Sequence, residues 1–342
     1  MNKRSMGLLG ACALALAGVG APTLAAVVTV YSADGLRDGR SNWFDTMFAA
    51  FTQQTGIDVQ YVEAGSGVIV NRVLAERTAA QADVLVTVPP FMQVAAAAHV
   101  LQPVLLPAEE EAALGGSSAA PWYPLIQNYS CWVYDAHSLA APPASFDALL
   151  APRFKGRIQY STPGQAGDGT AVMLQAFQAY GGKPGGFAFL GRLQANNLGP
   201  SSSTGRLAAL VNKGEIWIAN GDVQMNFAQR REYPNIRPFF PAGPDGVRHA
   251  MAMPYEIALV AGAPNADAGR KLIAFLLSKP AQQRVFDLAG GFPVRRDVSA
   301  SGPVAQALQH IVSGVQVWTP DWSQVAKELS VDVERWHQVT GN

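Results

Sequence analysis

Cysteine is nearly absent from this 342-residue chain, which contains Cys12 and Cys131 and no other thiol. Cys12 falls in an amino-terminal segment that we expect to be removed, so the mature chain cannot form an intramolecular disulfide. The five histidines are scattered and lack the spacing of a zinc site. The fold must therefore rest on an apolar core, which a chain of this length with 49 % hydrophobic residues can form. We predict no metal and no cofactor.

Charge is also sparse, because lysine plus arginine and aspartate plus glutamate number 25 each and make up only 15 % of the chain. There is no basic run, which argues against nucleic acid as a partner. Signatures of common enzymes are missing too: the chain has no Gly-x-Ser-x-Gly elbow, no His-Glu-x-x-His and no Walker loop. These absences favour a binding protein over an enzyme. A secreted phosphonate or phosphoester hydrolase remains the alternative from another class.

The amino terminus has the pattern of a secretory signal peptide. Lys3 and Arg4 precede an apolar run over residues 6–20, and small residues follow near position 25. We predict a signal peptide over residues 1–25, with cleavage after Ala25 or Ala26. A lipoprotein cleavage box at Leu9-Gly10-Ala11-Cys12 is the alternative. No later run is apolar and long enough to span a bilayer.

The mature chain begins with alternating strand and helix patterns. Apolar or β-branched runs at residues 27–31, 57–62 and 82–87 are each followed by a helical pattern. This alternation predicts a parallel sheet with crossover helices. In such sheets ligands bind beyond the carboxyl ends of the strands, and Ser32, Ser66 and Thr87 lie there.

Three Gly- and Ser/Thr-rich loops open predicted helices, at residues 65–67, 161–170 and 200–205. Glycines permit close approach of the backbone, and the first amides of a helix have no intrahelical partner. Such helix starts attract anions. Ser66 could equally be an ordinary helix cap, as could the hydroxyls in the other two loops.

Two extended segments, near residues 125–134 and 250–258, are long enough to cross between two halves of the protein. We therefore predict that residues 26–124 plus 256–342 form lobe 1 and residues 125–255 form lobe 2. Each lobe is expected to be a mainly parallel sheet flanked by helices.

Several short segments, taken together, resemble one family of transport proteins. They are Gly156-Arg157-Ile158, Gly167-Asp168-Gly169-Thr170, Ser201-Ser202-Ser203, Lys213-Gly214-Glu215-Ile216, Ala274-Phe275-Leu276-Leu277-Ser278 and Gly291-Phe292-Pro293-Val294-Arg295. The chain resembles periplasmic solute-binding proteins of ABC importers, in the branch of ferric-iron, polyamine, sugar-phosphate and phosphonate binders. Residues 28–36, 61–67 and 82–87 most resemble members that bind 2-aminoethylphosphonate.

The resemblance implies a two-lobed α/β protein of type II in the periplasm, a monomer that closes over its ligand and delivers it to a permease with its ATPase. The candidate ligand-binding residues are Ser32, Ala33, Asp34, Ser66, Gly67, Val68, Thr87, Thr162, Asp168, Gly169, Thr170, Ser202, Ser203, Asp222, Tyr255 and Glu256.

An amine ligand would also need a carboxylate or an aromatic face for its ammonium group. Asp34, Asp168, Asp222 and Glu256 are the candidate acids, and we rank Glu256 and Asp222 highest because they lie beside predicted strand ends or crossings. Another phosphonate, a phosphate ester or ferric iron remains an alternative ligand. Iron is disfavoured because ferric binders of this type commonly present adjacent tyrosines, and residues 231–234 contain one.

Overall fold

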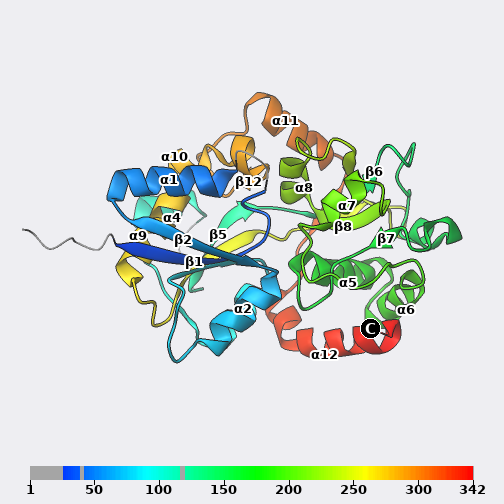
Figure 1. Ribbon diagram of the computed structural model, residues 1–342, viewed down its shortest axis with the longest axis horizontal. Helices are drawn as coiled ribbons and strands as arrows, with labels where there is room; N and C mark the ends of the chain where they lie inside the picture. Colours follow the sequence, from blue (N-terminus) through cyan, green and yellow to red (C-terminus); the bar gives the residue numbers. More distant parts are fainter. Residues whose placement is uncertain (1–25, 39–41, 116–119, 342) are drawn as a thin grey trace, which may run out of the picture.

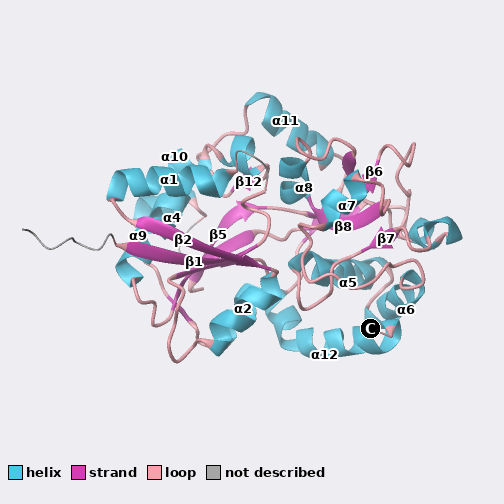
Figure 2. Cartoon of the chain, viewed as in Figure 1, coloured by secondary structure: helices cyan, strands magenta, loops and turns pink. Residues whose placement is uncertain are grey.

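The computed structural model describes residues 26–38, 42–115 and 120–341, so the expected signal peptide lies outside the described part of the chain. The strands form a seven-stranded sheet, a four-stranded sheet and a small pair. Figure 1 shows the two larger sheets side by side, and Figure 2 shows helices packed around both of them. Among the described helices, none is long and apolar enough to cross a membrane.

The seven-stranded sheet begins with three parallel strands. The β-branched run of β1 is buried almost throughout, and β1 pairs in parallel with both β2 and β3. The expectation of a mainly parallel sheet is wrong for this half, because the remaining pairings are antiparallel. Strand β11 re-enters from the other half and runs opposite to β3, β4 and β5, and β12 runs opposite to β5. The strands are β1 (Val27–Ala33), β2 (Asp58–Ala64), β3 (Val84–Thr87), β4 (Leu101–Gln102), β5 (Trp122–Gln127), β11 (Tyr255–Val260) and β12 (Phe292–Pro293).

Helices cover this sheet with their apolar faces. In α1, Phe44 and Phe51 are buried, Asn42 caps the start by accepting from the Asp45 amide, and Gly56 ends the helix in the left-handed conformation. The helices of this half are α1 (Trp43–Thr55), α2 (Ser66–Ala75), α3 (Phe91–Ala97), α4 (Ala108–Ala113), α9 (Ala266–Leu277), α10 (Lys279–Gln282) and the π-turn η3 (Val285–Ala289).

The four-stranded sheet has the order β7-β8-β6-β9. The expectation of a mainly parallel sheet is wrong here, because only β7 and β8 are parallel, whereas β6 is antiparallel to both of its neighbours. Its strands are β6 (Ser130–Asp135), β7 (Ile158–Gln159), β8 (Ile218–Asp222) and β9 (Ile236–Phe239). Its helices are α5 (Gly167–Ala179), α6 (Lys183–Leu193), α7 (Leu207–Asn212), α8 (Val223–Gln229) and the short turns η1 (Asp147–Leu150) and η2 (Pro152–Phe154).

Two crossing segments connect the sheets and lie next to each other. One runs from β5 through Asn128 and Tyr129 into β6, and the other runs from β10 (His249–Met251) into β11. Tyr129 bridges to Ala252, and the Met253 amide donates to the Asn128 carbonyl at 2.9 Å. We propose that these paired segments are the hinge between the two lobes.

The carboxyl-terminal segment packs on helices of both halves. Its elements are α11 (Gly302–Ile311), β13 (Gln316–Trp318), which pairs with β10, and α12 (Trp322–Thr340), which packs on α6 and α3. Trp336 of α12 is 1 % exposed and donates to the Tyr160 hydroxyl. We therefore propose that α12 belongs with lobe 2, although the sequence pattern placed residues 256–342 in lobe 1.

Replacing Trp336 tests how much this packing contributes to stability. Trp336→Ala should lower the free energy of unfolding, measured by urea titration, by about 3–5 kcal/mol, because it opens a cavity against Tyr160. Val331→Ala is the matched control, since Val331 lies on the same helix but is 67 % exposed. If Trp336→Ala lowers the free energy of unfolding no more than Val331→Ala does, the proposed packing of α12 against lobe 2 is contradicted.

Candidate functional site

The candidate site lies where the carboxyl end of β1 meets the loop before α7. The Asp34 carboxylate accepts from the Ser203 hydroxyl at 2.6 Å and from the Gly205 amide at 3.2 Å. The Tyr255 hydroxyl donates to the Asp34 carbonyl at 2.9 Å. Asp34 therefore joins a residue of β11 and a loop of the second half, so three predicted site residues come together here.

Asp168 and Asp222 approach Asp34 from the second half. Asp168 lies in the first turn of α5, while Asp222 ends β8 and caps α8 by accepting from the Met225 amide at 2.7 Å. Both are buried, at 7 % and 2 % exposure. We call Asp34, Asp168 and Asp222 the carboxylate cluster.

Burial and mutual repulsion favour the neutral forms of this cluster. Burial raises the pKa of Asp34, and it raises the pKa of Asp222 to about 6, with a further increase from the charge of Asp34. Burial and the charges of Asp222 and Asp34 raise the pKa of Asp168 well above its ordinary value. The same three acids add to the effect of burial on the Tyr255 hydroxyl and raise its pKa. Each acid of the cluster is thus biased toward its protonated form until an opposite charge approaches.

No basic side chain neutralises the cluster within the described residues. None of the ion pairs in these ranges involves Asp34, Asp168 or Asp222. One carboxylate oxygen of Asp168, Oδ1, is buried without a hydrogen-bond partner there. Buried carboxylates require a counter-charge or a proton, so the cluster is suited to bind a cationic group.

The start of α2 lies against the start of α5. The alternative role of Ser66 as a helix cap is wrong, because the N-cap residue of α2 is Gly65 and no side chain caps this helix. The Gly67 amide donates to the Gln165 carbonyl at 2.9 Å, and a Cβ at Gly67 would clash with the Gly164 carbonyl. The Ser66 hydroxyl in turn lies 2.9 Å from where a Cβ on Gly167 would be. Glycine is required at these positions because the two helix starts are in contact.

The other predicted hydroxyls of the first half are buried around the same strand ends. Ser32 donates to the Ala33 carbonyl at 2.8 Å, and Thr87 makes a long contact of 3.5 Å with the Ser66 carbonyl. Val68 is 42 % exposed and contributes its backbone position at the start of α2.

In the second half, two hydroxyls organise the loop before α5. Thr170 accepts from the Gly164 amide at 3.0 Å, and Thr162 accepts from the Ser201 amide at 3.2 Å. A Cβ on Gly169 would clash with the backbone of this loop, and the Ser202 carbonyl lies against Gly65 of the first half. These residues shape the contact between the halves.

Glu256 lies apart from the carboxylate cluster. Its carboxylate accepts from Trp122 Nε1 at 3.1 Å and from Gln93 Nε2 at 3.3 Å. Burial raises its pKa to about 8. The structure therefore does not bring Glu256 together with Asp34, Asp168 and Asp222, although it was ranked with Asp222 from the sequence.

Three polar residues near the cluster were not among the predicted site residues. Gln229 donates to the Asp38 carboxylate at 3.1 Å, and burial followed by the charge of Asp34 raises the pKa of Asp38. Gln224 donates to the Gly35 carbonyl at 3.1 Å and thereby links α8 to the first half. The position of Asp38, four residues after Asp34, was an available signal. Nothing in the sequence indicates that Gln224 and Gln229 lie near the cluster, because this depends on how α8 packs in the fold.

This architecture is that of a two-lobed periplasmic binding protein of type II. A periplasmic thiamin-binding protein shares the fold with a TM-score of 0.79 at 16 % identity, over 92 % of this chain and 96 % of that one. Apo ferric ion-binding protein A from Pasteurella haemolytica has a TM-score of 0.68 at 21 % identity, over 92 % and 97 % of the two chains. At these identities the likeness concerns the fold alone.

The chain belongs to the bacterial extracellular solute-binding protein family, whose model matches residues 46–310. A relative from Salmonella paratyphi A (strain ATCC 9150 / SARB42) is 53 % identical over 99 % of both chains. That relative is named "Putative 2-aminoethylphosphonate-binding periplasmic protein". The resemblance found in the sequence is thus confirmed at the level of fold and family, and the protein is periplasmic.

The raised pKa of Asp222 predicts how stability changes with pH. The folded state holds the proton of the Asp222 carboxyl more tightly than the unfolded state does. The contribution of this protonation to the stability of the folded state is therefore complete below about pH 4 and is lost as the pH rises through about 6. Asp222→Asn keeps a side chain able to cap α8 but removes the titration. Relative to wild type, its melting temperature without ligand should therefore rise between about pH 4 and pH 7.

The matched control is Asp321→Asn, which alters the exposed cap of α12 outside the carboxylate cluster. Its melting temperature should stay at a constant offset from wild type across the same range. A constant offset for Asp222→Asn as well would contradict the prediction.

Proposed function

We propose that this protein is the solute receptor of an ABC importer and that it captures 2-aminoethylphosphonate for delivery to a membrane permease driven by an ATPase. The observation that carries the proposal is the carboxylate cluster, with its buried and unpartnered Asp168 Oδ1, beside the paired starts of α2 and α5. The name of the 53 % identical relative supports the same ligand.

The carboxylate cluster provides the counterpart of an ammonium group. An ammonium carries one positive charge and three donors, which suits several carboxylate oxygens in a buried setting. Asp34 already accepts two hydrogen bonds and Asp222 caps a helix, so Asp168 has the free oxygen. We infer that Asp168 makes the direct contact and that the other two acids supply negative potential.

The phosphonate group is assigned to the start of α2. Ser66 offers a hydroxyl there, the positive end of the helix dipole favours an anion, and the buried hydroxyls of Ser32 and Thr87 lie at the adjoining strand ends. Ser66 lies against Gly167, which directly precedes Asp168. An anion site and a cation site this close together fit a ligand whose two charged groups are separated by two carbons.

Ligand binding is expected to favour closure of the lobes. The Asp34–Ser203 and Gly67–Gln165 hydrogen bonds already connect the halves, and a ligand between them would add contacts to both. A ligand that touches both lobes stabilises the closed form, because its affinity for that form is greater. Closure of this kind delivers the solute unchanged and needs no chemical step.

Calorimetric titration of the mature, ligand-free protein tests the ligand. We expect one-to-one binding of 2-aminoethylphosphonate, with ethylphosphonate weaker by about 10- to 100-fold because it lacks the charged donor. Tighter binding of phosphate or ferric citrate would overturn this ligand. Release of phosphate with turnover would overturn the binding-only role.

A pair of variants tests the position of the ammonium group. Asp168→Asn should weaken 2-aminoethylphosphonate by about tenfold or more and change ethylphosphonate affinity little, since only the first ligand carries an amine. Glu256→Gln is the matched control at a second buried acid and should bind both ligands as wild type does. If Glu256→Gln alone loses the preference for the amine, the ammonium lies at Glu256.

A further inference from the structure

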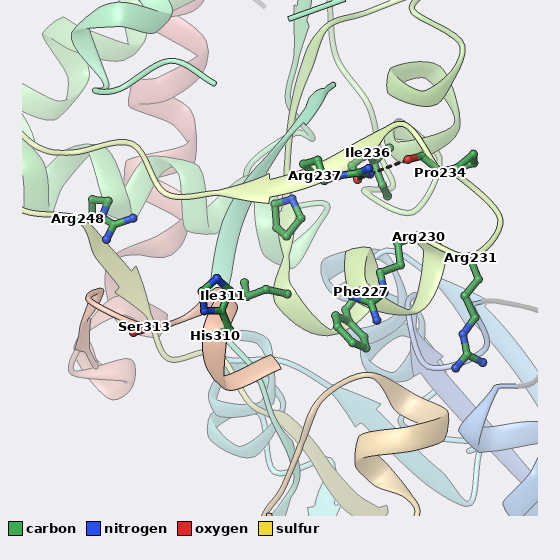
Figure 3. A pocket seen from close by; sticks show the side chains of 11 residues that line it. Phe227, Arg230, Arg231, Pro234, Ile236, Arg237, Arg248, His310, Ile311 and Ser313 are labelled. Atoms are coloured by element: carbon green, nitrogen blue, oxygen red, sulfur yellow. Dashed lines mark hydrogen bonds between the residues drawn. The ribbon is translucent and has the colours of Figure 1, made fainter. Parts of the chain in front are cut away.

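A concave pocket lies at the end of α8 opposite to Asp222. It is formed by the last turn of α8, the segment leading into β9 and the end of α11, and its cavity volume is about 770 Å³. Figure 3 shows the side chains that line it. The volume is in the range of pockets that hold small organic ligands.

The pocket is rich in positive charge. Arg230, Arg231, Arg237 and Arg248 line it together with His310, and its described lining contains no aspartate or glutamate. None of the four arginines takes part in an ion pair within the described residues. Burial and the charges of Arg231 and Arg237 lower the pKa of Arg230. The cations therefore repel one another without a compensating acid.

Two of these guanidinium groups are held in place by their surroundings. Arg230 stacks on the ring of Phe227, with 3.5 Å between the guanidinium carbon and the ring centroid. Arg237 donates to the carbonyls of Pro234 and Ile236 at 2.6 and 2.8 Å. A planar guanidinium held in this way is pre-organised for bidentate binding of phosphate-type oxygens.

The lining also has an apolar component. Pro234 is exposed, Pro238 and Ile311 are half-buried, and all three line the pocket. Apolar walls with a few convergent charged groups favour a ligand that has an organic body as well as an anionic group. Bare inorganic ions would use the arginines but leave this surface uncovered.

We propose that the pocket is a second ligand site, separate from the site between the lobes, and that it binds a small organic phosphate dianion with a compact apolar body. Arg230 at the end of α8 and Arg237 of β9 hold the phosphate oxygens, and the apolar lining covers the organic part. Because different residues form the two sites, this proposal does not depend on the identity of the transported solute.

Phenyl phosphate is the probe that matches this chemistry, with inorganic phosphate and benzoate as comparisons that each lack one feature. Calorimetry on the mature protein should show saturable phenyl phosphate binding, about tenfold tighter than inorganic phosphate or benzoate. The affinity should decrease with added salt.

The double variant Arg230→Gln/Arg237→Gln localises the binding. It should weaken phenyl phosphate by about tenfold or more. The matched control is Arg153→Gln, which removes another guanidinium stacked on a phenylalanine, Phe154, outside the pocket. This control should bind phenyl phosphate as wild type does. An unchanged melting temperature of the double variant shows that it is folded.

Three results would overturn the proposal. One is the absence of saturable phenyl phosphate binding to wild type. Another is equal binding by the folded double variant and wild type, which would place the probe elsewhere, including between the lobes. The last is an equal loss in Arg153→Gln, which would mean that general positive charge is responsible instead of this pocket.

Discussion

The burial of carboxylates between the two halves is the constraint on which the arrangement of this protein depends. The three acids of the carboxylate cluster come from both halves of the protein. Asp34 follows a strand of the first half, whereas Asp168 and Asp222 lie at helix starts of the second, yet their charges act on one another. Hydrogen bonds from Ser203 and Gly205 offset part of the free-energy cost of burying the Asp34 carboxylate. At Asp168 one oxygen has no such bond. No basic side chain pairs with these carboxylates within the described residues, so a cationic ligand group would offset the repulsion between them.

Close contact between two helix starts explains why this repulsion can be linked to closure. The start of α2 can reach the loop before α5 only because Gly67 has no side chain, and its amide then binds the Gln165 carbonyl across the boundary. Opening the lobes would break this bond together with the Asp34–Ser203 bond. Both contacts adjoin the carboxylate cluster, so charge neutralisation by a ligand and the inter-lobe bonds stabilise the same closed arrangement.

Local patterns predicted the elements better than their assembly. The strands at residues 27–31 and 57–62 follow from periodicity and correspond to β1 and β2. Strand direction did not follow in either large sheet, because β11 pairs antiparallel with β3 and β6 pairs antiparallel with β8, and both pairs join segments far apart in the sequence. Ser66 was expected at a helix start and is the first residue of α2, but the N-cap position belongs to Gly65. The sequence identified Asp168 and Asp222 as separate candidate residues, and only the fold shows that they lie in one cluster.

The near balance of acidic and basic residues conceals a separation of charge along one short helix. At the start of α8, Asp222 accepts from the helix amides and adds to the carboxylate cluster. At its other end Arg230 joins three further arginines in a pocket whose described lining contains no acid. The helix dipole favours a negative group at the first end and a positive group at the second. Formal charges that cancel in composition are therefore segregated in space, and each concentration calls for a ligand group of the opposite sign.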